Sequence, residues 1–518
     1  MRKTGINKKG DITMNFETAE VTYEKPHRLS GILLHPTSCP SPYGIGDLGQ
    51  DAYDFVDFLE KAHQKCWQIL PISPTSYGDS PYQSFSVHAG NPYFIDLEAL
   101  EKEGYLKPAE YKDIEWGDDK GSVDYGKIYE VIFKVLRTAH KRFRKKPEKA
   151  YSKFVVENKD WIYDYALFMS LKFANKGKAW YEWDEPLKMY KPKAIKSARK
   201  EYANDIDFWC FVQYKYFQQW KKLKAYANEK GIEIIGDIPI YVAYDSVEVW
   251  STPQYFSLDK EKKPVEVAGC PPDAFTADGQ LWGNPLYNWE YIARDKFRWW
   301  VERIKAASDT YDVVRIDHFR GFESYYCIPY SAKNAKKGKW RKGPDMRLFK
   351  EVRKQLGDVK IIAEDLGFLT KHVVKMLNAS GYPGMKVLEF GFDSDNTNGY
   401  LPHNYKTTNS ICYTGTHDNE TILGWIKSCD EKTRSYCKDY LGVTKDEFVP
   451  WAMVRLCWSS VCDTAIAQMQ DILCLDDKAR MNTPSTVGTN WKWRLESFDK
   501  LDDTLAERLT KITAVYGR

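Results

Sequence analysis

The chain has 518 residues, of which 43% are hydrophobic, so it can bury a large core and is no small binding module. Its 76 Lys and Arg against 72 Asp and Glu leave a net charge of +4, which provides no strong field for a nucleic acid. Aromatic residues make up 15% of the chain, and their flat rings pack against sugars as well as in protein cores.

The cysteines and the N-terminal segment indicate the compartment. Eleven cysteines are scattered from Cys39 to Cys474 without a C-x-x-C pair or a nearby His at metal-ligand spacing, which predicts reduced thiols and no metal site. Residues 1–27 are polar and charged and are predicted to form a flexible tail. Because no apolar run has signal-peptide or membrane-spanning length, the sequence predicts a cytoplasmic protein with no membrane partner.

Eight short β-type runs recur along the chain, each followed after a loop by a helical stretch. Before the third run, apolar residues recur at helical spacing from Phe217 to Ala227, and Gly231 ends that helix. The alternation predicts an α/β fold of the (β/α)8 or TIM-barrel type, although periodicity alone also allows an open doubly wound sheet. The runs are residues 31–35, 66–72, 232–239, 311–317, 359–365, 386–390, 411–416 and 465–469.

Two long stretches interrupt this alternation within a catalytic barrel expected to span residues 28–518. Residues 98–201 are too many for a βα connection and contain helical patterns, so they predict an inserted helical subdomain. Residues 251–288 are irregular and rich in Pro, Gly and Asp, which is typical of a substrate lid or of a disordered excursion.

Three of the runs end on an acidic residue inside a polar cluster. Asp317 lies in VVRIDHFRG, Glu364 in IIAEDLG and Asp418 in YTGTHDNET. Because all strands of a parallel barrel finish at one face, these carboxylates are expected to converge. Retaining glycosidic chemistry needs an ionised carboxylate that attacks and a protonated one that donates, and Asp317 and Glu364 can fill these roles. Arg315, on the same side of the strand, favours an ionised Asp317, whereas a neighbouring anion raises the pKa of Glu364.

Structural roles are the alternative for each polar residue near the strand ends. An isolated acid there usually caps a helix or pairs with Lys, and this interpretation is kept for Asp312, Asp365 and Glu420. His417 is favoured for binding sugar hydroxyls, and His318 is the weaker candidate, because a lone His is more often structural.

Further motifs accompany the carboxylate clusters in a fixed order: YGIGD (43–47), GDSPYQS (78–84), GDIPIY (236–241), GCPPD (269–273), GQLWGNP (279–285) and NWKWR (490–494). With them, residues 28–495 resemble the amylomaltases or disproportionating enzymes, which are 4-α-glucanotransferases of the α-amylase clan. The resemblance implies a TIM barrel without the C-terminal β-sandwich of α-amylases. It also implies transfer of α-1,4-glucan segments to glucose or to another glucan, without a metal or an organic cofactor.

The resemblance implies roles for individual residues. Asp317 matches the nucleophile, Glu364 the acid/base and Asp418 the third carboxylate, which grips and distorts the sugar. Arg315 and His417 match residues that support them. The other substrate-contacting positions are Ser80, Tyr82, Asp237, Pro272, Asp273, Trp282 and Asn490. For Tyr82 and Trp282, core packing is the alternative.

Three other functions are weighed against the transferase. The nearest rival is an α-amylase-type hydrolase with the same carboxylates, which would raise the number of reducing ends. A catalytically silent glucan-binding protein would have no need for the complete carboxylate set. A nucleic-acid-binding protein is the weakest option, because the sequence has no basic stripe or known module of that kind.

Overall fold

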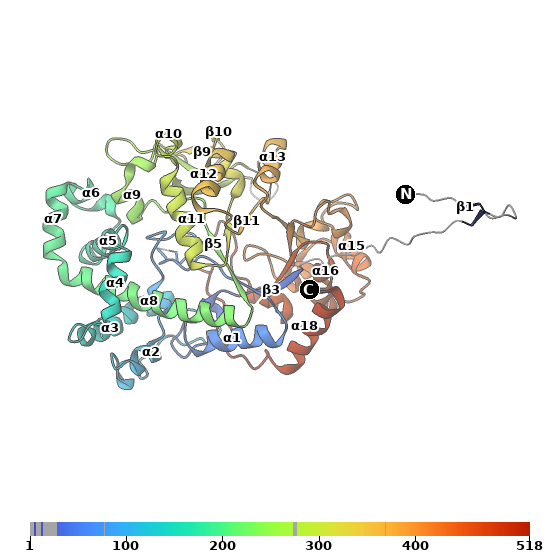
Figure 1. Ribbon diagram of the computed structural model, residues 1–518, viewed down its shortest axis with the longest axis horizontal. Helices are drawn as coiled ribbons and strands as arrows, with labels where there is room; N and C mark the ends of the chain where they lie inside the picture. The colour runs from blue at the N-terminus through green and yellow to red at the C-terminus, as the bar shows by residue number, and fades with distance from the viewer. Residues whose placement is uncertain (1–4, 7–11, 14–27, 77, 273–276, 368) are drawn as a thin grey trace.

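The computed structural model describes residues 5–6, 12–13, 28–76, 78–272, 277–367 and 369–518 (Figure 1). Its centre is a sheet of eight parallel strands in the order β11-β8-β5-β4-β3-β14-β13-β12. The strands are β3 (Leu29–Leu33), β4 (Cys66–Gln68), β5 (Glu233–Ile238), β8 (Val313–Ile316), β11 (Ile361–Ala363), β12 (Gly384–Val387), β13 (Ser410–Tyr413) and β14 (Thr464–Gln468). Each of the eight predicted runs overlaps one of these strands.

The two end strands of this sheet, β11 and β12, approach each other and nearly close it into a barrel. The Ala363 N–H donates to the Pro383 carbonyl at 2.9 Å, and the Met385 N–H donates to the Asp365 carboxylate at 2.7 Å. Asp365 therefore has the structural role that was expected of it. The (β/α)8 barrel is confirmed over the open doubly wound sheet.

Helices surround the strands and pack against one another in sequence-distant pairs, such as α1 with α18 and α11 with α12. The main ones are α1 (Gln50–Lys61), α8 (Ala203–Glu229), α11 (Arg298–Thr310), α12 (Met346–Leu356), α13 (Lys371–Ser380), α14 (Ile422–Ser428), α15 (Glu431–Leu441), α16 (Val449–Ser459) and α18 (Asp503–Tyr516). In Figure 1, α8, α1 and α18 follow one another along one side of the molecule.

One connection differs from the predicted alternation. Between β12 and β13 the chain forms only the 3-10 helices η7 (Leu388–Gly391) and η8 (Pro402–Asn404), so the helix expected after the sixth run is wrong. The segment is rich in Asn, Asp and Gly, whose side chains or flexibility favour turns over helices. Asn398 shows the effect, because its amide donates to the Phe390 carbonyl at 2.9 Å and to Asp393 at 2.9 Å.

The long segment between β4 and β5 is helical, as predicted. Its elements up to α8 are η2 (Pro92–Phe94), α2 (Leu97–Lys102), η3 (Pro108–Glu110), α3 (Tyr125–Phe143), α4 (Lys149–Glu157), α5 (Ile162–Ala174), η4 (Trp180–Glu182), α6 (Glu185–Lys188) and α7 (Pro192–Glu201). They gather at one end of the molecule in Figure 1, where α5 packs on α8. Whether residues 98–201 form a separate subdomain stays a prediction.

The region 251–288 is more regular than the sequence indicated. It contains α9 (Val247–Ser251) at its start, η5 (Pro253–Tyr255), β6 (Glu266–Cys270) and β7 (Gln280–Pro285). These two strands join β9 (Ser324–Pro329) and β10 (Lys339–Lys342) in an antiparallel sheet of order β10-β9-β6-β7. The expectation of an irregular loop is wrong for this part, because β6 takes its second partner, β9, from a distant segment.

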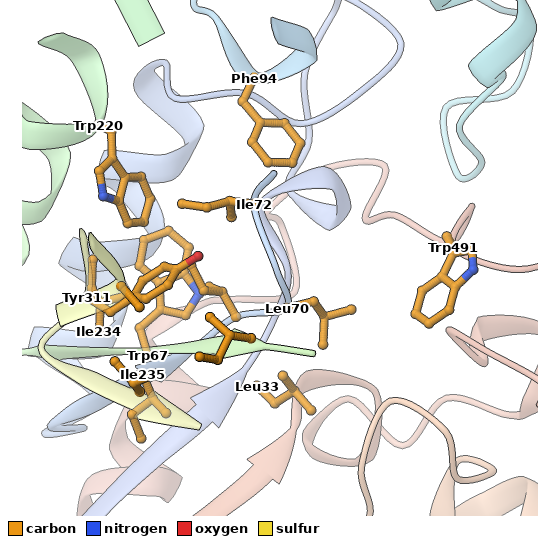
Figure 2. Packing of buried hydrophobic residues seen from close by; sticks show 14 of the residues in the cluster. Leu33, Trp67, Leu70, Ile72, Phe94, Trp220, Ile234, Ile235, Tyr311 and Trp491 are labelled. Carbon is orange, nitrogen blue, oxygen red and sulfur yellow. The ribbon is translucent and has the colours of Figure 1, made fainter. Parts of the chain in front are cut away.

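A hydrophobic core supports β4 and β5 beneath the site. Trp67 of β4 and Ile234 of β5 lie beside Tyr311 and Trp220 (Figure 2). A Cβ at Gly236 would lie 2.1 Å from the Tyr311 ring, so only glycine lets this ring pack directly on β5. The close packing fixes the position of the next residue, Asp237.

The chain after the barrel contains helices and irregular segments. Residues 469–518, all of them described, contain α17 (Met469–Ile472), η10 (Asp477–Ala479) and α18 and no strand, so no β-sandwich lies within them. Among the described residues, none of the helices has the length and apolar character needed to cross a membrane.

Candidate active site

The three predicted carboxylates lie at the carboxyl ends of barrel strands. Asp317 directly follows β8 and Glu364 directly follows β11, whereas Asp418 lies in the loop after β13. The Asp317 N–H donates to the Ile238 carbonyl at the end of β5 at 3.0 Å. The Glu364 N–H donates to the Ile316 carbonyl at the end of β8 at 3.1 Å. These main-chain bonds hold the first two acidic residues side by side on adjacent strands, as their position in the sequence predicted.

Arg315 connects Asp317 to the next strand. Its guanidinium lies 3.1 Å from Asp317 Oδ1 and donates to Asp237 Oδ2 at 2.5 Å. Arg315 and Asp237 are only 4% and 1% exposed, whereas the Asp317 side chain is 30% exposed. The buried pair thus holds a partly accessible carboxylate at the surface of the barrel mouth.

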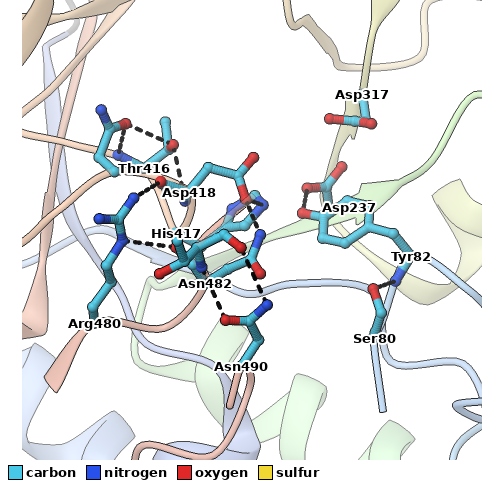
Figure 3. A network of polar contacts seen from close by, with 12 residues as sticks. Ser80, Tyr82, Asp237, Asp317, Thr416, His417, Asp418, Arg480, Asn482 and Asn490 are labelled. Carbon is cyan, nitrogen blue, oxygen red and sulfur yellow. Dashed lines mark hydrogen bonds and ion pairs between the residues drawn. The ribbon is translucent and has the colours of Figure 1, made fainter. Parts of the chain in front are cut away.

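Tyr82 extends this network to the loop after β4. Its hydroxyl donates to Asp237 Oδ2 at 2.7 Å, and its ring stacks on His417 with centroids 5.1 Å apart (Figure 3). Burial and the Asp237 charge raise the pKa of Tyr82 well above its ordinary value, so the phenol keeps its proton and donates. The Ser80 hydroxyl accepts the Tyr82 N–H at 3.2 Å and orders the loop. Tyr82 is therefore part of the polar network and not only of the core.

Two main-chain groups hold the Glu364 carboxylate. Its Oε2 accepts the His318 N–H at 2.7 Å and its Oε1 accepts the Leu366 N–H at 2.6 Å. His318 adopts φ +51°, in the left-handed region that residues with a side chain seldom occupy. This turn after Asp317 aims the His318 N–H at Glu364, which is 8% exposed.

Burial dominates the electrostatics of both carboxyl groups. It raises the pKa of Glu364 above its ordinary value, opposed by Arg315 and by the two main-chain N–H groups. Burial also raises the pKa of Asp317 well above its ordinary value, with Arg315 as the largest opposing influence and Glu364 adding to the rise. Arg315 opposes this rise, in the direction that its position in the sequence predicted, but burial is the larger influence on Asp317. At Glu364 the charge of the neighbouring Asp365 raises the pKa in the predicted direction, but it contributes less than burial.

Asp418 lies on the other side of the group drawn in Figure 3, with its carboxylate directed toward the side of Asp317 and Asp237. Its side chain is 49% exposed, and its Oδ1 accepts from Asn482 at 2.6 Å and lies 3.4 Å from His417 Nε2. Burial lowers the pKa of His417 despite the adjacent Asp418, so the imidazole is neutral. A neutral ring can donate from one nitrogen and accept at the other.

The remaining predicted residues differ in how they relate to the carboxylates. Trp282 of β7 contacts the His318 ring edge-on at 4.9 Å, beside the turn after Asp317. Pro272 is exposed just after β6, and Asp273 lies outside the described residues. Asn490 uses its side chain within its own loop, where Oδ1 accepts the Thr483 N–H at 3.0 Å and Nδ2 donates to the Thr486 carbonyl at 3.0 Å. Its substrate-binding role stays a prediction.

Sequence reasoning missed three residues of the site. Asn482 binds the Asp418 carboxylate, and Arg480 donates to the Asp418 carbonyl at 2.9 Å. The Trp491 ring lies 5.9 Å from both the Tyr82 and the His417 rings. The NWKWR motif, which contains Trp491, could have indicated this residue. Nothing in the sequence near Asn482 and Arg480 connects them to Asp418.

Among the residues that the structure describes, no group of three or more His, Cys, Asp or Glu side chains could hold a metal ion. None of the eleven cysteines, all of which the structure describes, is joined in a disulfide.

Comparisons with known proteins agree with this arrangement. Residues 34–500 match the model of a glycoside hydrolase family, number 77, described as 4-alpha-glucanotransferase. The 4-alpha-glucanotransferase of Clostridium butyricum is 48% identical over 94% of this chain and 100% of its own length. A chloroplastic or amyloplastic relative of the same name from Arabidopsis thaliana is 40% identical over 95% of this chain and 86% of its own.

A solved structure is similar along nearly its whole length. The amylomaltase from Streptococcus agalactiae in complex with acarbose superposes with a TM-score of 0.92 at 43% identity, covering 95% of this chain and 99% of that one. The match extends over the barrel, the helical segment and the site. The chain therefore belongs to the 4-alpha-glucanotransferase family.

Proposed function

We propose that Asp317 and Glu364 are the nucleophile and the acid/base of this 4-α-glucanotransferase. The enzyme transfers a segment of an α-1,4-glucan to the 4-hydroxyl of glucose or of another glucan. The observation that carries the assignment is the contact of Arg315 with Asp317 alone of the two carboxylates, at 3.1 Å, beside the buried Glu364. Arg315 opposes the rise in pKa that burial causes at both carboxyl groups, and its direct contact with Asp317 places the charge there and leaves the proton on Glu364 when the pair holds one proton.

The first half of the reaction breaks the glycosidic bond. Asp317 attacks the anomeric carbon, and Glu364 donates its proton to the leaving oxygen, which releases one part of the glucan. The other part stays on Asp317 as a glucosyl ester with inverted configuration.

The second half joins the held segment to an acceptor. Glu364, now ionised, takes the proton of the acceptor 4-hydroxyl while the acceptor oxygen attacks the anomeric carbon and displaces the Asp317 carboxylate. The second inversion restores the α-configuration, so the enzyme is retaining. The reaction uses only the carboxyl groups of the protein and the two sugars, and we propose that it needs no metal or organic cofactor.

We propose that Asp418 and His417 bind hydroxyls of the sugar whose bond is cleaved. The exposed Asp418 carboxylate and the neutral imidazole provide acceptors and a donor on the side opposite Asp317. Asn482 and Arg480 hold Asp418 in place. Further contacts to the glucan are proposed for Ser80, Tyr82, Asp237, Pro272, Asp273, Trp282 and Asn490.

Transfer and hydrolysis differ only in the acceptor, which is a sugar in the first and water in the second. The segment around Trp282 is therefore expected to decide which acceptor reacts. We propose that the region of residues 251–288, which includes Trp282, acts as a lid that excludes water and positions the acceptor sugar. The test is incubation with pure maltotriose, followed by chromatography and a reducing-end assay. Transfer gives shorter and longer oligosaccharides at a constant number of reducing ends, and an α-amylase-type hydrolase would raise that number.

We also propose a cytoplasmic location without nucleic-acid partners. The support is the set of eleven cysteines outside disulfides, which a reducing compartment keeps as thiols. Fractionation of the source cells, with the enzyme assayed in each fraction, tests the location.

A further inference from the structure

We propose that Trp340 forms an additional sugar-binding position for long α-glucans at the rim of the active site. The proposal rests on the proposed function, because its ligand is the same substrate class. Trp340 is 42% exposed and is the only exposed one of the 18 tryptophans, all of which the structure describes. Each of the other 17 is buried or half-buried.

The strand register places Trp340 next to the proposed lid. Trp340 of β10 pairs with Tyr326 of β9, and Tyr326 pairs with Gly269 of β6. Residues paired directly across a sheet share one face, so these three positions form a row. The next residue after Gly269 is Cys270, which ends β6. Trp340 therefore lies in the same row as Gly269, which is near the end of β6 and belongs to the proposed lid region of residues 251–288.

Arg320 connects Trp340 to the nucleophile loop. Its guanidinium lies 4.1 Å from the centre of the Trp340 ring, and it comes three residues after Asp317. Arg320 is 5% exposed and donates to the Ser324 hydroxyl at 3.2 Å, so its position is fixed. The contact covers one face of the indole, and Tyr326 meets the ring edge-on at 5.2 Å. The exposed area is thus the opposite face, a flat apolar surface that suits the C–H side of a glucose ring.

The surroundings of Trp340 favour a sugar over a protein partner. β10 is an edge strand, and its sequence Lys-Trp-Arg-Lys carries the charges that discourage the addition of another strand. Lys339 and Arg341 point to the other face, where they pair with Glu266 at 3.3 and 2.6 Å. One indole is far smaller than the apolar patch of several hundred Å² that marks a protein interface. It is the right size for one sugar ring.

The expected consequence is a preference for long substrates. A chain that reaches from the carboxylates to Trp340 gains a contact that maltotriose does not gain in full. In Trp340→Ala, the ratio of kcat/KM for amylose to kcat/KM for maltotriose should therefore fall roughly threefold to tenfold. Trp340→Phe, which keeps a flat ring, should retain most of the wild-type ratio.

A matched control and a binding measurement complete the test. Phe448 of η9 (Asp446–Phe448) is 51% exposed, and Phe448→Ala should leave the ratio unchanged. In a Glu364→Gln background, calorimetric titration with amylose should show weaker binding after Trp340→Ala, with a smaller effect for maltotriose. An unchanged ratio, or an equal loss on both substrates through displacement of Arg320, would contradict the proposal. Failure of the wild-type enzyme to transfer from maltotriose would instead contradict the proposed function.

Discussion

Arg315 holds Asp317 with one side of its guanidinium and Asp237 with the other, at 3.1 and 2.5 Å. The two acids come from neighbouring strands, and only Asp317 has substantial exposure, at 30% of its side chain. Because the buried Asp237 balances the charge of Arg315, the guanidinium stays in place when Asp317 loses its charge on forming the ester and regains it when the ester is resolved. The relationship gives Asp237 a role that can be tested separately from the chemistry.

We expect Asp237→Ala to destabilise the fold and to slow turnover. It leaves Arg315 buried with a single carboxylate partner, and breaking a buried ion pair costs about 3–5 kcal/mol. Tyr82→Phe is the matched control, because it removes one hydrogen bond to the same Asp237 oxygen and should cost about 1 kcal/mol. Urea unfolding of the three proteins measures the difference. Equal stability of Asp237→Ala and the wild type would show that Arg315 does not depend on Asp237.

Asp317→Ala and Asp418→Asn should each lower turnover by about three orders of magnitude or more, since residues that act as one catalytic unit show losses of this size. Both side chains are partly exposed, so both variants should fold. Transfer from maltotriose and the circular dichroism spectrum are the two measurements. Near wild-type transfer by either variant would remove that residue from the catalytic set.

Turnover should depend on pH as a bell-shaped curve. On the acid side, activity is lost as Asp317 takes up a proton, and burial shifts this limb upward by raising the pKa of Asp317. On the alkaline side, activity is lost as Glu364 gives up its proton, at a pH above the ordinary value for Glu. The two limbs belong to the interacting pair. A rate that keeps rising into alkali would exclude a carboxylic acid as the proton donor.

Trp282→Ala should raise the share of hydrolysis. The indole contacts His318 beside the nucleophile loop, and its loss would open this region to water. The ratio of glucose released by water to oligosaccharide formed is the observable, with Phe448→Ala as an exposed aromatic control. An unchanged ratio would return Trp282 to a role in core packing alone.

The barrel and its carboxylates were predictable because both depend on local patterns that the fold repeats. Each buried strand reads as a short apolar run, and Asp317 and Glu364 directly follow two of them, so parallel strands bring them together. Long-range pairing was not predictable in this way. Nothing near Glu266–Cys270 shows that its partner is Ser324–Pro329, and nothing near Asn482 shows that it binds Asp418.

The sequence also could not predict how burial and nearby charges balance in setting the pKa values of the two carboxyl groups. The position of Arg315 two residues before Asp317 predicted their contact correctly. The sequence could not show how deeply the barrel mouth buries both carboxyl groups, and it is burial that dominates the pKa of each.

The assignment of Asp317 and Glu364 is tested most directly by Glu364→Gln, which keeps the shape of the side chain and removes the proton donor and base. With an ordinary glucan the first step should nearly stop, because the leaving oxygen must be protonated. An α-maltooligosyl fluoride has a leaving group that departs with little help from an acid, so Asp317 can still attack it. The sugar should then stay bound to Asp317 as a covalent ester, because a glutamine at position 364 cannot activate an acceptor.

The measurement is the mass of the intact Glu364→Gln protein after incubation with the fluoride, followed by peptide mapping. The account predicts one added oligosaccharide mass on the peptide that contains Asp317, and no such addition in the double variant with Asp317→Ala. A label on another peptide, or ready turnover of an ordinary glucan by Glu364→Gln, would contradict the roles of both residues.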